Sequence, residues 1–231
     1  MGKVSFSKSQ EPWIRGGPLL EVSFLIEVRT SRQDFITQIL TDLGKISLRV
    51  EVVPTNVELA TVKEEFARGY PLDEKDAESV NVHSVSIPVY VHFKEHRKAY
   101  IRIQQISETL ANISFDFFGS AHDAREWRQK GVKETDLPTF VDLLEKLFDV
   151  FEFPVGTIGL EYDSKDLFPI DVGWPNSGYD LRNLDMTRLT NIDATHFICI
   201  LLNKRLPYPR MDQKAKETHK YLLLGWKGLW H

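Results

Sequence analysis

Alternation of apolar and polar residues predicts the first strand, between residues 20 and 28. Only Leu25 breaks its period of two. Ser31 and Asp34 then supply side chains that can bind free amides at a helix start, and apolar residues follow at helical spacing up to Gly44. Alternation returns from Ile46 to Val52 and ends at Pro54. The segment is therefore predicted to form a strand, a helix and a second strand.

The next stretch predicts a helix and three strands. Thr55 and Glu58 have the spacing of a capping box, so we expect a helix that ends at Gly69. Alternating residues then mark strands over 85–93, 100–103 and 113–118. Short connections between these strands favour an antiparallel meander. The polar stretch after Gly119 predicts at most a short helix, over residues 123–129.

The C-terminal half begins with the clearest helical pattern in the chain. After Asp136, a wide apolar stripe continues to Phe151, and Pro138 suits the first turn of that helix. A strand is expected over 155–160 and a buried strand over 197–202. Residues 163–190 show no sustained period and predict a long loop. Residues 211–224 predict a final helix.

Together these elements predict an α+β fold. We expect a mostly antiparallel sheet of about six or seven strands, with three or four helices packed mainly on one face. Residues 1–18, rich in Ser, Lys, Gly and Pro, are expected to form a loose arm, with Trp13 and Ile14 as its anchors. Residues 19–231 are then a single domain, which can be divided into pseudo-duplicated halves at 19–70 and 80–165.

Composition excludes several classes of protein. The 231 residues are 42% hydrophobic and 27% charged, as in soluble globular proteins. The single cysteine, Cys199, rules out an internal disulfide and a cysteine-based zinc site. No apolar stretch has the length of a signal peptide or a membrane span, so a cytoplasmic protein with no membrane partner is expected. A net charge of −4 argues against a generally basic nucleic-acid binder.

The seven histidines prompt a search for a metal site. His92 and His96 are four residues apart, but on an extended strand this spacing separates their Cα atoms by about 13 Å. The acidic residues near 163–166 do not match a calcium-binding loop either. No metal and no cofactor is therefore predicted, and no phosphate-binding glycine loop or catalytic motif is present.

A polar group follows the strand that ends at Phe118. His122 and Asp123 are adjacent, and Arg125 and Arg128 come shortly after them. Loops that leave a sheet often carry functional groups, since the sheet fixes their position. The imidazole could act as a general base, and the arginines could hold an anion. A simple polar turn explains the same residues.

Charge is unevenly distributed in the second half of the chain. Residues 134–185 contain 12 acidic and 3 basic residues, whereas residues 203–231 contain 7 basic and 2 acidic residues. Aromatic residues occur among the carboxylates of the long loop, and such residues often anchor interfaces. The candidate binding residues are Asp163, Asp166, Phe168, Asp171, Trp174 and Tyr179. The basic tail packing over an acidic face is the simpler explanation.

Two functional hypotheses follow. The first is a non-catalytic protein-binding module, of inhibitor or immunity type, that uses the acidic and aromatic surface to bind a basic protein. The second is a small enzyme or ligand-binding protein with a polar pocket around His122 and Asp123.

Overall fold

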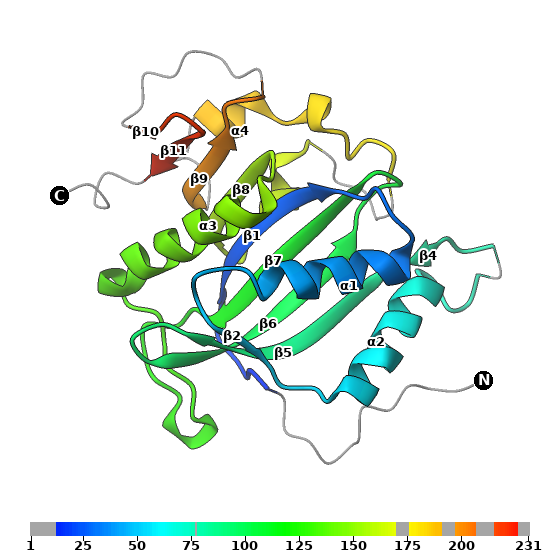
Figure 1. Ribbon diagram of the computed structural model, residues 1–231, viewed down its shortest axis with the longest axis horizontal. Helices are drawn as coiled ribbons and strands as arrows, with labels where there is room; N and C mark the ends of the chain where they lie inside the picture. The colour runs from blue at the N-terminus through cyan, green and yellow to red at the C-terminus, as the bar shows by residue number, and fades with distance from the viewer. Residues whose placement is uncertain (1–12, 77, 170–175, 191–196, 207–214, 226–231) are drawn as a thin grey trace.

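The computed structural model describes residues 13–76, 78–169, 176–190, 197–206 and 215–225. One large antiparallel sheet dominates this part of the chain (Figure 1). Its nine strands lie in the order β10-β11-β9-β8-β1-β7-β6-β5-β2. In chain order they are β1 (Leu19–Glu27), β2 (Val50–Val52), β5 (Ser84–His92), β6 (His96–Gln105), β7 (Leu110–Phe118), β8 (Val155–Leu160), β9 (Phe197–Asn203), β10 (Ala215–Glu217) and β11 (Tyr221–Gly225). The α+β class and the antiparallel sheet are thus confirmed.

Three helices cover one face of this sheet, which is the near side in Figure 1. They are α1 (Arg32–Leu43), α2 (Asn56–Arg68) and α3 (Leu137–Phe151). The capping box predicted before α2 is present, with Thr55 and Glu58 bonded to each other's backbone amides. Ser31 caps α1 by accepting a hydrogen bond from the Asp34 amide. The apolar side of each helix packs onto the sheet and forms the larger core.

Part of the opposite face of the sheet is covered by residues 163–169 and 176–190, which lie between β8 and β9 in the chain. These residues include two 3₁₀ helices (Ser164–Leu167 and Leu181–Asn183) and the short α4 (Met186–Thr190). Leu167, Phe168 and Tyr179 pack against outward-facing residues of the sheet in a second core. A separate pair of short strands, β3 (Tyr70–Pro71) and β4 (Asn81–Val82), follows α2.

The prediction of a C-terminal helix over 211–224 is wrong for its described part. Residues 215–217 and 221–225 are strands β10 and β11, while residues 211–214 lie outside the described residues. Tyr221 and Leu223 contact the larger core, and Leu222 and Leu224 contact the second core. A strand buried on both faces shows a continuous apolar run instead of alternation, and such a run does not by itself distinguish a strand from a buried helix.

The predicted strand count is also too low, because the predicted final helix hides β10 and β11. The strand expected over 46–52 shortens to β2, and Ile46 is buried in an irregular segment. β2 pairs with β5 at the edge of the sheet, so β1 and β2 are separated by three strands. The helix expected over 123–129 is only a 3₁₀ turn at Arg125–Trp127. The meander β5–β6–β7 and the helix after Asp136 are confirmed.

Helix α3 packs so closely on β8 that a side chain at Gly156 is expected to destabilise the fold. A Cβ atom there would lie 2.6 Å from the Phe153 ring and 2.9 Å from Leu144. The Phe153 ring is stacked on Phe24 at 4.8 Å, so it has little room to move. We expect Gly156→Ala to lower the free energy of unfolding by about 1–3 kcal/mol, measured by urea denaturation.

Gly44→Ala is the matched control. Gly44 ends α1 with a right-handed φ of −66°, and its added Cβ would meet only the Thr41 carbonyl oxygen. This variant should change the unfolding free energy by less than about 1 kcal/mol. Equal effects of the two substitutions would contradict the tight packing between α3 and β8.

Candidate functional site

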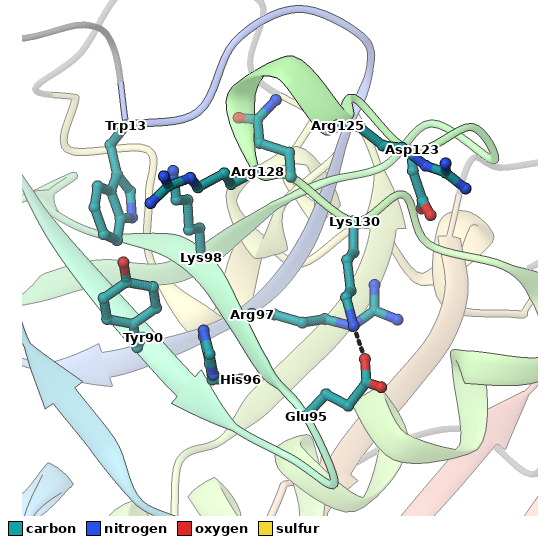
Figure 2. A pocket seen from close by; sticks show the side chains of 11 residues that line it. Trp13, Tyr90, Glu95, His96, Arg97, Lys98, Asp123, Arg125, Arg128 and Lys130 are labelled. Atoms are coloured by element: carbon teal, nitrogen blue, oxygen red, sulfur yellow. Dashed lines mark ion pairs between the residues drawn. The ribbon is translucent and has the colours of Figure 1, made fainter.

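Three segments that are far apart in the sequence enclose a cavity of about 870 Å³ (Figure 2). One segment is the N-terminal stretch at Trp13, the second is the β5–β6 hairpin, and the third is the loop 123–130. We call this cavity the basic cavity. It is lined by Trp13, Tyr90, Glu95, His96, Arg97, Lys98, Asp123, Arg125, Arg128, Gln129 and Lys130.

The hairpin contributes side chains from both faces of the sheet. Tyr90 on β5 and Lys98 on β6 are cross-strand partners on the face opposite the helices. Arg97 points to the helix face, where it donates a hydrogen bond to Asp136 at 2.7 Å and lies over the Phe140 ring. Because adjacent strand residues alternate between faces, the hairpin end brings cations from both faces to one opening.

The loop 123–130 has a defined backbone structure. Ala124 and Gln129 form a short antiparallel bridge around the 3₁₀ turn, and Arg128 adopts a left-handed conformation with φ of 53°. The Asp123 carboxylate accepts a hydrogen bond from the Gly131 amide at 3.0 Å. A Cβ at Gly131 would lie 2.0 Å from the Ser120 carbonyl oxygen. Only glycine therefore fits at residue 131, where the chain leaving the loop passes close to the chain entering it.

Gln129 and Trp13 fix the N-terminal segment against the loop and the sheet. The buried Gln129 amide accepts a hydrogen bond from the Arg15 amide at 2.7 Å and donates one to the Arg15 carbonyl at 2.9 Å. Trp13 donates its backbone N–H to the Tyr100 hydroxyl and its indole N–H to the Ala99 carbonyl, both at 3.0 Å. These bonds hold Trp13 in a set position on the cavity wall.

Positive charge dominates the lining. Its five permanent cations are Arg97, Lys98, Arg125, Arg128 and Lys130, against the carboxylates of Glu95 and Asp123. Three of these cations are engaged within the protein: Arg97 pairs with Asp136, Lys130 with Glu95, and Lys98 donates to the Trp127 carbonyl at 3.0 Å. In Figure 2, Arg128 reaches toward Lys98 and Trp13.

Arg125 and Arg128 are the cations available for a ligand. Both side chains are exposed, and neither has a hydrogen bond or ion pair among the described residues. Figure 2 shows them on different sides of the loop, with Arg125 beside Asp123. A guanidinium group binds phosphate or carboxylate through two parallel hydrogen bonds, so each can receive an anion.

The structure brings three of the four residues of the predicted polar pocket together. Asp123, Arg125 and Arg128 line the basic cavity, whereas His122 is exposed and does not line it. The sequence analysis did not predict that the β5–β6 hairpin, including Tyr90, would line this cavity. The signal that could have shown it is the run of His96, Arg97 and Lys98 between two predicted strands.

The acidic and aromatic residues proposed as an interface lie mostly inside the protein. Asp163 is 2% exposed, Phe168 2% and Tyr179 6%, and Asp166 is half-buried. Phe168 and Tyr179 pack edge to face at 5.2 Å in the second core. Asp171 and Trp174 lie outside the described residues. Asp163, Phe168 and Tyr179 are therefore not on the surface of the described part of the chain, and Phe168 and Tyr179 cover part of the sheet.

His92 and His96 are closer than the strand-spacing argument predicts. The turn of the hairpin makes them cross-strand partners, and their ring centroids are 5.8 Å apart. His92 also contacts Glu51, at 3.1 Å. Across the described ranges, no group of three or more metal-ligating side chains could hold an ion.

A second polar group is buried beneath the segment that follows β8. Glu21 on β1 lies opposite Asp116 on β7 in the ladder, and Asp116 pairs with Arg102 at 2.5 Å. Asp163 pairs with Lys165 at 2.6 Å. One carboxylate oxygen of Glu21 has no hydrogen-bond partner. These five residues form what we call the buried charge cluster.

The electrostatic environment of Glu21 favours its neutral form. Its pKa is raised to about 8, mainly by burial and also by the neighbouring carboxylates of Asp116 and Asp163, while Arg102 and Lys165 oppose the rise. If all five groups were charged, three carboxylates would face two cations. A protonated Glu21 leaves the remaining charges balanced, which fits its position between two acidic neighbours.

No protein-family model matches this chain, and neither curated proteins nor solved structures give a significant match. None of the helices within the described ranges is long and apolar enough to cross a membrane.

The raised pKa of Glu21 predicts how stability changes with pH. Its ordinary value is 4.5, so the folded state keeps a proton that the unfolded state loses between pH 4.5 and about 8. This stabilising contribution is complete below pH 4.5 and is lost as pH rises to about 8. Glu21→Gln cannot ionise, so its unfolding free energy should exceed that of the wild type at pH 8 to 9 by a few kcal/mol, given about 1.4 kcal/mol per pKa unit.

Urea denaturation of both proteins between pH 5 and pH 9 measures this difference. Glu27→Gln, at the exposed end of the same strand, controls for the loss of a carboxylate. A Glu21→Gln protein whose stability follows the wild type at every pH would show that Glu21 is ionised in the folded state.

Proposed function

We propose that this chain is a ligand-binding protein that holds a small anion in the basic cavity. The observation that carries the proposal is the pair of exposed guanidinium groups, Arg125 and Arg128, which lack partners among the described residues. They line the same cavity as three further cations in a protein whose net charge is −4. Concentrating positive charge in one concave site of an acidic protein raises the local concentration of anions there.

The size and construction of the cavity support a small ligand. Ligand sites of roughly 300–1,000 Å³ are typical, and the basic cavity falls within this range. The Gln129 side chain and the Asp123–Gly131 hydrogen bond fix the loop that carries the arginines. A site whose backbone is already held in place loses less conformational entropy when it binds.

Each cation has a distinct role in this proposal. Arg128, which extends toward Lys98 and Trp13, binds the anion directly through paired N–H groups, and Arg125, on the other side of the loop, adds to the positive potential of the cavity. Lys130 can turn from Glu95 toward the ligand, because both side chains are largely exposed and such pairs are weak. Arg97 is half-buried and held by Asp136, so it contributes to the local potential from a fixed position.

Binding is better supported than catalysis. The general base of the catalytic hypothesis, His122, does not line the cavity. The carboxylate of Asp123 is already bonded to the Gly131 amide. The alternative of an acidic protein-binding surface loses support from the burial of Asp163, Phe168 and Tyr179.

The experiment that tests this function is titration of the full chain with inorganic pyrophosphate in a calorimeter. Wild-type protein should bind, and Arg125→Ala with Arg128→Ala should weaken binding by at least about tenfold, the loss expected for one charged hydrogen bond. Affinity should also fall as salt is added, since exposed charges are screened.

Arg68→Ala is the matched control. Arg68 is an exposed arginine at the end of α2 that does not line the cavity, so its loss should leave the affinity unchanged. His122→Ala should likewise bind as the wild type does. Pyrophosphate that fails to bind the wild type, or that binds the double variant equally well, would refute the proposed function.

A further inference from the structure

We infer that the anion bound in the basic cavity is the phosphate of a mononucleotide, whose base packs on an aromatic wall of the same cavity. This inference rests on the proposed function and adds the class of ligand. The observation behind it is that aromatic rings and cations line one cavity together. A simple phosphate would need only the cations.

The aromatic wall consists of Trp13, Tyr90 and His96. Trp13 and Tyr90 meet edge to face with ring centroids 4.8 Å apart, and Tyr90 and His96 do so at 5.1 Å. Tyr90 and Trp13 are half-buried and His96 is exposed. Rings that remain partly exposed in this way offer π surface to a planar ligand.

Trp13 is fixed in a way that suits a stacking surface. Its indole N–H is already donated to the Ala99 carbonyl, so the indole offers a ligand its ring and no further hydrogen-bond donor. Lys98 lies over this ring with its ammonium 4.7 Å from the centroid. A cation placed beside an aromatic ring brings the sites for a base and for a phosphate close together.

Figure 2 shows how the two kinds of site are arranged. Trp13 and Tyr90 stand together on one wall, and Arg128 extends from the loop toward that wall. The phosphate of a nucleotide can therefore bind Arg128 while its base lies on the aromatic wall. Tyr90 presents a hydroxyl that makes no hydrogen bond among the described residues, and its ring is packed at a steep angle against Trp13.

A free mononucleotide fits this site better than a nucleic-acid strand. A strand binds through a long series of cations that neutralise successive phosphates. Here the chain carries a net charge of −4 although its cavity is rich in cations, so the residues outside the cavity carry a net negative charge. A net negative charge outside the cavity disfavours a ligand that carries many phosphates.

The test compares two ligands that share a phosphate and differ in the base. The full chain is titrated with adenosine monophosphate and with ribose 5-phosphate, and binding is followed by calorimetry. Adenosine monophosphate should bind about tenfold tighter, as expected for stacking of one base. Tyr90→Leu should remove this preference but keep the affinity for ribose 5-phosphate.

Trp13→Leu is a second variant, although loss of the indole hydrogen bond to the Ala99 carbonyl can loosen the N-terminal segment. Trp127→Leu controls for general effects of removing a tryptophan, because Trp127 packs on Arg15 outside the cavity. It should keep the preference for the nucleotide.

The outcomes separate this inference from the proposed function. Equal affinity for the two ligands, or a preference that survives Tyr90→Leu, overturns the aromatic site and leaves anion binding in place. Failure of both ligands and of pyrophosphate overturns both proposals. A short oligodeoxyadenylate that binds far more tightly than adenosine monophosphate overturns the choice of a free nucleotide.

Discussion

The pairing of β1 with both β7 and β8 holds the two parts of the sheet together. β1 pairs with β7 over its whole length, from Leu19 to Glu27, and with β8 from Leu20 to Phe24. Strands β9 to β11 join the sheet only through β8, and strands β2, β5 and β6 only through β7. Both faces of β1 are buried, with Phe24 under α3 and Leu25 in the second core. The hairpin that carries the basic cavity therefore depends on this one strand for its connection to the rest of the sheet.

The sequence predicts most directly the elements whose apolar residues recur with a clear period. Strand β5 has polar or half-buried residues on one face, so its alternation is visible, and α3 shows a continuous apolar stripe. Strand β11 is buried on both faces, and its run of leucines carries no period of two. The insertion of β1 between β7 and β8 depends on long-range pairing, which local patterns do not encode.

The candidate site was only partly predictable for a similar reason. Asp123, Arg125 and Arg128 are close in sequence, so a local pattern finds them. Trp13 and Tyr90 reach the same cavity through tertiary contacts: Trp13 donates a hydrogen bond to Ala99 on β6, and Tyr90 lies beside the cavity through the β5–β6 pairing. The exposure of the long loop was overestimated because its polar and aromatic residues show no regular period. Asp163 can be buried because its carboxylate pairs with the partly exposed Lys165.

The two polar groups of this structure balance their charges in opposite ways. In the buried charge cluster, a protonated Glu21 leaves two carboxylates facing Arg102 and Lys165, and the cluster is neutral without a ligand. In the basic cavity, five cations face two carboxylates, and the excess is exposed to solvent. Like charges held together on a fixed loop repel each other, and a bound anion relieves this repulsion. A ligand that binds only the folded chain stabilises it, so an anion bound in the cavity, as proposed above, would stabilise the hairpin and the loop that form the cavity.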